Sequence, residues 1–285
     1  MGEGTGYVAA DRQLTVIIPC KNEQLNIRPC IESFRSIADE ILVADSGSTD
    51  ETLHIVRRLG GCRIIEREYI HSGDFKNWAI PQATHQWVLI VDADERVTPE
   101  LAAEITQILK SNRPLDGYWI YRANYFMGHP IRYCGWGSDK VLRLFRRDLG
   151  RYVGDNDHAE VEVSTGRAGR LQARLDHYGV RSYDHYIPKL QRYTSFQAQI
   201  WNRNGRRWSY LKLLLNLPLR FAQTYLLRGG FLDGAAGLQV CMITAFISFQ
   251  KQARLWEQQC GIATCDASQL PVATAGDEER PRSAA

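Results

Sequence analysis

The sequence lacks the cysteine patterns that would assign it to several common classes. Its seven cysteines include no CxxC pair, which argues against a zinc ribbon and a thioredoxin-like redox motif. An odd number of irregularly spaced cysteines is typical of reduced thiols in the cytosol. Residues 1–13 are glycine-rich and polar, without the apolar stretch of a secretory signal. The sequence therefore predicts a cytoplasmic protein that does not depend on disulfides.

Long apolar runs and a large net charge are also missing. No run reaches the roughly 20 apolar residues of a membrane-spanning helix. The nearest, residues 234–250, is uncharged but is interrupted by Gly237, Gln239 and Thr244, so a span is not favoured. The net charge of +3 is too small to indicate nucleic-acid binding, and we expect none. The 285 residues, 44% of them hydrophobic, can bury a sizeable core in one large domain or two small ones.

Acidic residues are absent from one long stretch. Between His185 and Leu232 there is no Asp or Glu, whereas Lys and Arg occur at positions 189, 192, 203, 206, 207, 212, 220 and 228. Unopposed positive charge of this kind attracts anionic surfaces.

The first hundred residues alternate between short apolar runs and helical patterns. The runs that predict buried strands are Leu14–Pro19, Ile41–Ala44, Cys62–Ile65 and Trp87–Val91. Apolar spacings of three and four predict the helices between them, and Pro99 begins another helix. This order predicts an α/β fold, a Rossmann-like and mostly parallel sheet with flanking helices. Ligands of such sheets bind beyond the carboxyl ends of the strands.

The pattern changes after Asp116. Residues 117–125 and 141–145 are expected to form strands, and 151–165 is polar and loop-like. The predicted organisation is a flexible N-terminus at 1–13, an α/β domain at 14–185, an amphipathic helical region at 186–259 and a disordered tail at 260–285.

Two carboxylates, Asp92 and Asp94, follow the fourth predicted strand. Such a pair at a strand end suits Mg²⁺ or Mn²⁺, with phosphate oxygens completing the coordination. The alternative is a turn with solvated acids. Asp45 ends the second predicted strand and could bind a nucleotide base or ribose, or could serve only as a turn residue.

Four motifs in order carry a resemblance to a known family. VIIPCKNE, ILVADSGSTDET, GDFKNWAI and WVLIVDADERV resemble glycosyltransferase family 2, over Leu14 to Val97. The resemblance implies a GT-A fold at 14–185 and a nucleotide-sugar donor, with a UDP-sugar the expected one. The later sequence, Tyr118 to Glu257, is similar more loosely to the WaaE-type lipopolysaccharide-core glucosyltransferases of bacteria. That second resemblance suggests a glycan or lipid-linked acceptor of the cell envelope.

The resemblance also implies roles for individual residues. Pro19, Glu23 and Asp45 fall where the family contacts the nucleoside, and Lys76 and Asn77 fall near the base and phosphates. Asp92 falls at the ribose or a metal-bound water, and Asp94 at the metal ligand that bridges to the diphosphate.

The catalytic base and a third metal ligand stay open. Relatives of the second match often read Val-His-Glu where this sequence reads Asp157, His158, Ala159 and Glu160. Glu160, Asp157 and Asp155 are therefore candidates for the base that deprotonates the acceptor, with His158 as an orienting group or alternative base. His177 could be a third metal ligand, since neutral imidazole suits Mn²⁺, or a histidine satisfied at the sheet edge.

Three functions remain compatible with the residues. The first is an inverting, metal-dependent glycosyltransferase. The second is a sugar-1-phosphate nucleotidyltransferase. Such enzymes usually carry a glycine-rich loop after the first strand, whereas the corresponding loop here has no glycine. The third is a membrane-surface binding module, because the apolar residues of 210–228 and 240–256 are interleaved with basic ones, as in helices that lie on an anionic leaflet. We expect a peripheral enzyme at the inner face of the cell membrane.

Overall fold

A computed structural model of the chain describes residues 12–154 and 159–260. The N-terminal half alternates strands and helices: β1 (Leu14–Cys20), α1 (Ile27–Phe34), β2 (Glu40–Asp45), α2 (Thr52–Leu59), β3 (Arg63–Glu66), α3 (Ser72–Ala79), β4 (Trp87–Ile90), β5 (Glu95–Val97) and α4 (Pro99–Lys110). The predicted α/β class with flanking helices is confirmed. Thr98 caps α4, since its hydroxyl accepts a hydrogen bond from the backbone N–H of Leu101.

These strands form one mixed sheet with the strands that follow. Its order is β3-β2-β1-β4-β8-β6-β11-β5, and β7 also pairs with β6. The later strands are β6 (Gly117–Phe126), β7 (His129–Ile131), β8 (Lys140–Arg146) and β11 (Ala168–Val180). β1 to β4 pair in parallel, β8 is antiparallel to β4 and β6, and β11 is parallel to β6. The carboxyl ends of β1, β2 and β4 therefore meet at one edge.

Two apolar layers cover the sheet. On one face, α1, α2 and α4 pack their buried side chains, among them Phe34, Val56 and Leu101, against alternate residues of β1, β2 and β4. On the other face, Phe75 and Ala79 of α3 pack against the remaining residues of the same strands. Side chains alternate between the two faces of a strand, so apolar runs that are buried on both sides produce this three-layer arrangement.

One prediction for the middle of the chain is wrong, and one strand was missed. Residues 151–165 are not simply a loop, because β9 (Gly150–Val153) and β10 (Glu160–Val163) form a small antiparallel sheet. The long strand β11 was not among the predicted strands. It holds His177 beside β6, with Asn124 as its partner in the register.

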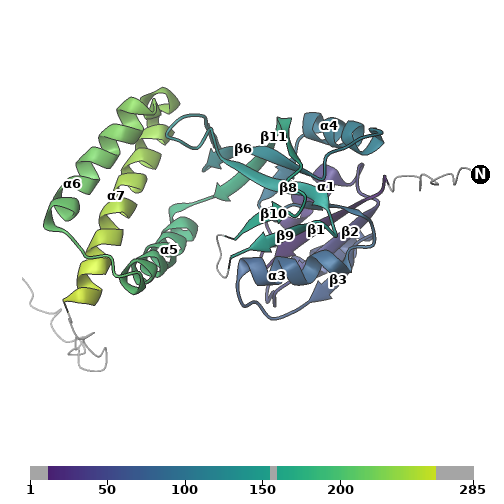
Figure 1. Cartoon of the computed structure of the whole chain (residues 1–285), viewed down its shortest axis with the longest axis horizontal. Helices are drawn as coiled ribbons and strands as arrows, with labels where there is room; N and C mark the ends of the chain where they lie inside the picture. Colours follow the sequence, from purple (N-terminus) through teal and green to yellow (C-terminus); the bar gives the residue numbers. More distant parts are fainter. Residues whose placement is uncertain (1–11, 155–158, 261–285) are drawn as a thin grey trace, which may run out of the picture.

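The C-terminal region is helical, as predicted. It comprises α5 (Tyr183–Arg203), α6 (Tyr210–Ala222) and α7 (Gly234–Gln259), which lie together beside the α/β body in Figure 1. Hydrogen bonds from Trp208 to Gln259 and from Asn216 to Ser248 show that α6 runs antiparallel to α7. Asp233 joins the helices to the sheet by accepting the backbone N–H groups of Arg132 and Tyr133.

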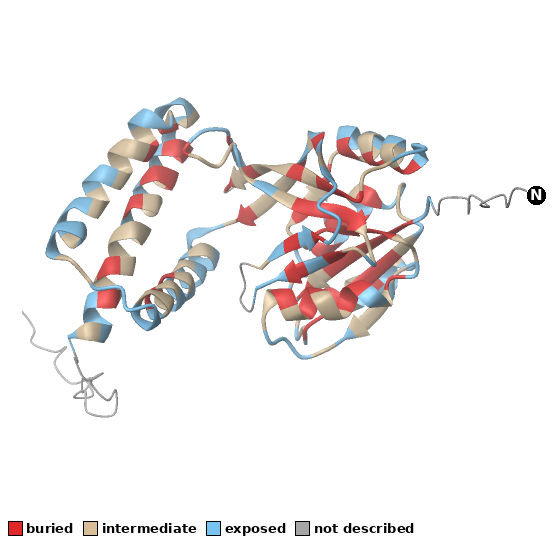
Figure 2. Cartoon of the chain, viewed as in Figure 1, coloured by how far each residue is buried: buried red, intermediate tan, exposed pale blue. Residues whose placement is uncertain are grey.

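The helical region is much less buried than the sheet (Figure 2). α6 has no buried residue, and Leu211 and Leu219 are 65% and 61% exposed. One described helical stretch, Gly230–Gln259, is long and apolar enough to cross a membrane by length and composition alone. The predicted terminal segments, 1–13 and 260–285, lie almost wholly outside the described residues.

Candidate active site

A cleft of about 710 Å³ lies at the edge where the carboxyl ends of β1, β2 and β4 meet. Pro19 and Glu23 border it after β1, Ser46 after β2, and Asp92 and Asp94 after β4. The strand-end positions singled out in the sequence thus converge on one cleft, as the parallel arrangement predicts.

Asp92 is held by two cations inside the cleft. Lys76 Nζ lies 3.0 Å from one carboxylate oxygen, and Arg143 of β8 forms an ion pair with the other. Arg143 also binds Glu95 at 3.0 Å, and both of these side chains are buried. Burial opposes ionisation of Asp92, but the charges of Arg143 and Lys76 outweigh it and lower the pKa well below its ordinary value. Asp92 is therefore a carboxylate at neutral pH.

Asp94 has a different partner, His177. The carboxylate oxygen lies 3.6 Å from His177 Nε2, and the backbone N–H of Tyr178 donates to the Asp94 carbonyl. Burial again opposes ionisation, while the hydrogen bond and charge of His177 lower the pKa of Asp94. Asp94 is thus the acid of the pair that no Lys or Arg among the described residues neutralises at ion-pair distance.

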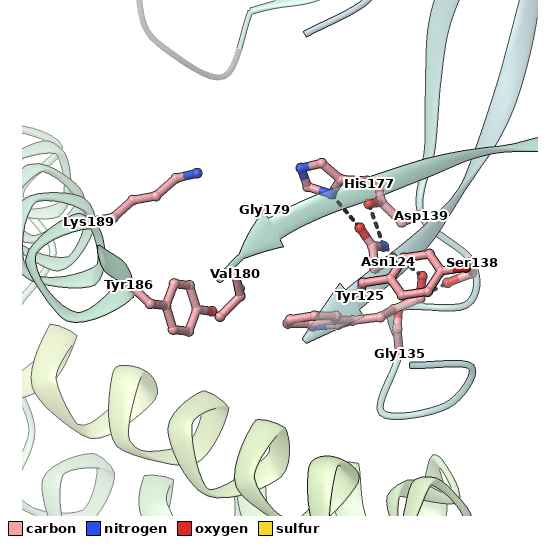
Figure 3. A pocket seen from close by; sticks show the side chains of 11 residues that line it. Asn124, Tyr125, Gly135, Ser138, Asp139, His177, Gly179, Val180, Tyr186 and Lys189 are labelled. Atoms are coloured by element: carbon pink, nitrogen blue, oxygen red, sulfur yellow. Dashed lines mark hydrogen bonds between the residues drawn. The ribbon is translucent and has the colours of Figure 1, made fainter. Parts of the chain in front are cut away.

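Asn124 fixes the orientation of the His177 ring and the protonation of its Nδ1 atom. His177 Nδ1 lies 2.6 Å from Asn124 Oδ1, as Figure 3 shows. The Asn124 amide nitrogen is already used, because it donates to Asp139 at 3.0 Å. Asn124 Oδ1 must therefore accept, so His177 Nδ1 carries a proton and Nε2 is the ring nitrogen that faces Asp94.

This geometry fits a divalent cation. An imidazole lone pair and a carboxylate oxygen that face each other repel unless a proton or a cation lies between them. Mg²⁺ and Mn²⁺ are often bound by one or two protein groups together with substrate phosphates. The described residues contain no group of three or more His, Cys, Asp or Glu that could hold a metal, so phosphate oxygens would have to complete the coordination.

The carboxylate of Asp45 accepts its hydrogen bonds from the turn after β2 and from Cys20 on β1. It is fully buried and accepts the N–H groups of Gly47 and Ser48, the Ser48 hydroxyl and the Cys20 thiol. Gly47 has a φ of +90°, which glycine adopts without strain. Asp45 is not among the described residues that line the cleft, and it positions Ser46, which is.

Lys76 and Asn77 are adjacent residues of α3, but only Lys76 lines the cleft. Lys76 lines the cleft, and its ammonium group lies 5.2 Å from the centre of the Tyr152 ring. Asn77 forms two hydrogen bonds with the backbone of Tyr152, at 2.8 and 2.9 Å. Asn77 therefore joins α3 to β9 and supports the cleft from behind.

The segment proposed to carry the base is described only in part. Glu160 begins β10, is exposed and lines the cleft. Asp155, Asp157 and His158 lie outside the described residues. Glu23 also lines the cleft, and burial raises its pKa although a hydrogen bond from Asn26 opposes the shift.

Sequence reasoning missed several residues of this site. Arg143 is the most important, and Arg122, Lys140 and Lys189 also line the cleft. A charged residue between Leu142 and Leu144, inside an apolar strand, was the available signal for Arg143, because a buried cation needs acidic partners.

The sequence was also compared with protein-family models and with known proteins, and similar ones were found. The family model "Glycosyl transferase family 2" matches residues 15–170. The lipopolysaccharide core biosynthesis glycosyltransferase LpsC of Rhizobium meliloti is 28% identical, with 86% of this chain and 92% of that protein covered. An uncharacterized glycosyltransferase of Rickettsia prowazekii is also 28% identical, over 86% of this chain and 87% of that protein.

Among solved structures, the chain is similar to that of glucosyl-3-phosphoglycerate synthase from Mycobacterium tuberculosis in complex with Mn²⁺, UDP-glucose and phosphoglyceric acid. It has a TM-score of 0.45 and 17% sequence identity, and the match covers 70% of this chain and 82% of that one.

Proposed function

The chain belongs to glycosyltransferase family 2, and from that premise we propose that it transfers a sugar from a nucleotide-sugar to a glycan or lipid-linked acceptor of the cell envelope. The observation that carries this proposal is the strand-end cleft in which Asp92, Asp94 and His177 lie together. We propose a UDP-sugar as the donor and inversion at the anomeric carbon.

Asp94 and His177 would hold the metal ion, Mg²⁺ or Mn²⁺, which when bound would stabilise the negative charge that develops on the departing diphosphate. Lys76 and Arg143 supply further positive charge at the same edge of the cleft. Asp92 forms ion pairs with both of these side chains. We therefore propose that Asp92 orients them, and that it also contacts the ribose or a metal-bound water. Fixed charges of this kind stabilise a transition state without reorganising.

Glu160 is the proposed base. It borders the cleft from β10 and would accept the proton of the acceptor hydroxyl as the hydroxyl oxygen attacks the anomeric carbon. Asp157 and His158 remain proposed members of the same segment, as base and orienting group. Pro19, Glu23 and the turn of Asp45 would surround the nucleoside.

The cell-envelope acceptor is proposed from the similarity to LpsC, whose name places that protein in lipopolysaccharide core synthesis. A sugar of such a glycan is attached to lipid, so the enzyme would meet it at a membrane surface. We therefore propose a cytoplasmic enzyme that is peripheral to the inner face of the cell membrane.

The exposed apolar surface of α6 supports this location. Leu211, Leu214 and Leu219 are all more than half exposed, and Lys212 and Arg220 accompany them on the same helix. Each basic residue near an anionic leaflet contributes about 1 kcal/mol to the binding free energy before screening.

Liposome sedimentation tests this location. At low salt, anionic vesicles should sediment the wild-type protein and Leu25→Glu, a control at another exposed leucine. Leu214→Glu should stay in the supernatant, and binding that ignores lipid charge and salt would contradict the electrostatic part.

A donor screen tests the proposed activity. Nucleotide-sugars with different bases are incubated with the protein and Mn²⁺, with and without an envelope-glycan fraction, and products are detected by mass. We expect one donor to lose its sugar to water or to the glycan, with release of a nucleoside diphosphate. Formation of nucleotide-sugar from a nucleoside triphosphate and a sugar 1-phosphate would instead indicate a nucleotidyltransferase.

A further inference from the structure

A second cavity, of about 370 Å³, lies beside the donor cleft and shares two residues with it. The shared residues are His177 on β11 and Lys189 on α5. Figure 3 shows both side chains at the same side of this cavity. A molecule bound in the second cavity would therefore lie next to the proposed metal–diphosphate edge, where the sugar is transferred.

Three aromatic side chains line this cavity: Tyr125, Trp136 and Tyr186. All three are partly exposed, and Tyr125 is fixed by stacking on Tyr178 with ring centres 4.5 Å apart. A pyranose ring presents an apolar face of C–H groups and an edge of hydroxyl groups. Partly exposed aromatic rings beside a few polar groups provide for both.

The acid in this cavity is neutralised by its neighbours. Asp139 accepts hydrogen bonds from Arg122 Nε at 2.9 Å and Asn124 at 3.0 Å, and it lies 2.8 Å from a second Arg122 nitrogen. Its carboxylate can still accept a hydroxyl hydrogen bond, but it does not make the cavity negative.

Lys189 gives the cavity a net positive charge. Its side chain is exposed, and no carboxylate among the described residues lies within ion-pair distance of it. After Asp184, α5 contains no acid, and the next one in the chain is Asp233. The wall that α5 contributes is therefore basic, which suits an anionic ligand.

We propose that this second cavity is the acceptor subsite and that it takes a sugar ring carrying an anionic group, a phosphate or a carboxylate, with Lys189 binding that group and Trp136 contacting the ring. The inference rests on the proposed function, because it assigns the acceptor of that same reaction. Lys189 thereby becomes a specificity-determining residue on a helix that the family model does not match, since that match ends at residue 170.

Ligand-observed NMR with simple probes tests the subsite without requiring the natural acceptor. The probes are glucose 6-phosphate, glucuronate, glucose and inorganic phosphate, each added to the full chain with UDP and Mn²⁺. We expect saturation transfer to the ring protons of both anionic sugars and weaker transfer to glucose. Excess inorganic phosphate should reduce the signals only partly. Lys189→Gln should weaken binding of the anionic sugars by about threefold to fivefold, as expected for an exposed ion pair.

The variants separate the subsite from the donor cleft. Trp136→Ala should remove saturation transfer to all the sugars, and Lys110→Gln, a control on α4, should leave it unchanged. UDP affinity, measured by calorimetry, should be the same in wild-type protein, Trp136→Ala and Lys110→Gln, because neither Trp136 nor Lys110 lines the donor cleft. Equal binding of glucose and the anionic sugars, or wild-type binding by Lys189→Gln, would overturn the proposal even if Trp136→Ala fails to fold. Failure of the wild-type protein to bind UDP would instead refute the proposed function.

Discussion

Replacing Asn124 by Leu should perturb the proposed metal site without changing either of its proposed ligands, Asp94 and His177. Asn124 is buried and accepts the Nδ1 proton of His177 at 2.6 Å. The variant removes the group that fixes the tautomer and ring orientation, while Asp139 keeps its pair with Arg122. Loss of such an outer partner of a metal-binding histidine typically lowers metal affinity by about 10-fold to 100-fold, which corresponds to about 1.4–2.7 kcal/mol.

Calorimetric titration of Mn²⁺ into protein saturated with UDP measures this effect. Asn216→Leu is the matched control, because its amide bonds to Ser248 between α6 and α7, away from the cleft. We expect the control to bind Mn²⁺ as the wild type does. Thermal unfolding must show that Asn124→Leu is folded, since the unsatisfied His177 N–H alone costs about 1–3 kcal/mol. A folded Asn124→Leu with wild-type Mn²⁺ affinity would refute the tautomer argument.

Four further predictions follow from the same geometry. Asp94→Ala should abolish transfer in a protein that still folds, and turnover near wild type with normal metal dependence would exclude it as a ligand. Asp45→Ala should weaken donor binding more than it slows single-turnover chemistry, because in the proposed function the Ser46 turn would contact a part of the donor that does not react. Glu160→Gln should lower the rate by about 10²-fold to 10⁴-fold with donor affinity retained, whereas an unchanged rate would move the base elsewhere. Although burial raises it, hydrogen bonds led by that from Thr15 lower the pKa of Glu40 to about 2. Its stabilisation is therefore complete above about pH 4.3 and lost as pH falls toward 2, and Glu40→Gln should flatten that acid limb in denaturant titrations.

The fold could be predicted where local sequence patterns decide it. β1 to β4 are apolar on both faces, so their runs are visible without any knowledge of their partners. β10 reads EVEV and alternates between exposed and buried residues, yet its four residues are too short and polar to stand out. β11 was missed because its polar residues become stable in a strand only beside β6, about fifty positions earlier in the chain.

Only the acidic residues of the site could be predicted from the sequence, and their partners could not. Asp92 and Asp94 follow an apolar strand, and that position together with the family resemblance suggested their role. Arg143 lies in a strand that pairs with β4 from more than fifty positions later, so its ion pairs with Asp92 and Glu95 exist only in the folded sheet. The pairing of His177 with Asn124 likewise depends on the register of β11 against β6, which no local pattern specifies.

Whether the strand-end cleft holds a metal–diphosphate pair is tested most directly by UDP binding with and without Mn²⁺. Calorimetry on wild-type protein, Asp94→Asn and the exposed control Asp148→Asn compares UDP affinity in Mn²⁺ and in EDTA. We expect Mn²⁺ to strengthen UDP binding in the wild type and in Asp148→Asn, and to have no effect in Asp94→Asn. Equal UDP affinity in Mn²⁺ and EDTA for the wild type, or a full Mn²⁺ effect in Asp94→Asn, would contradict the placement of the metal at Asp94 and His177.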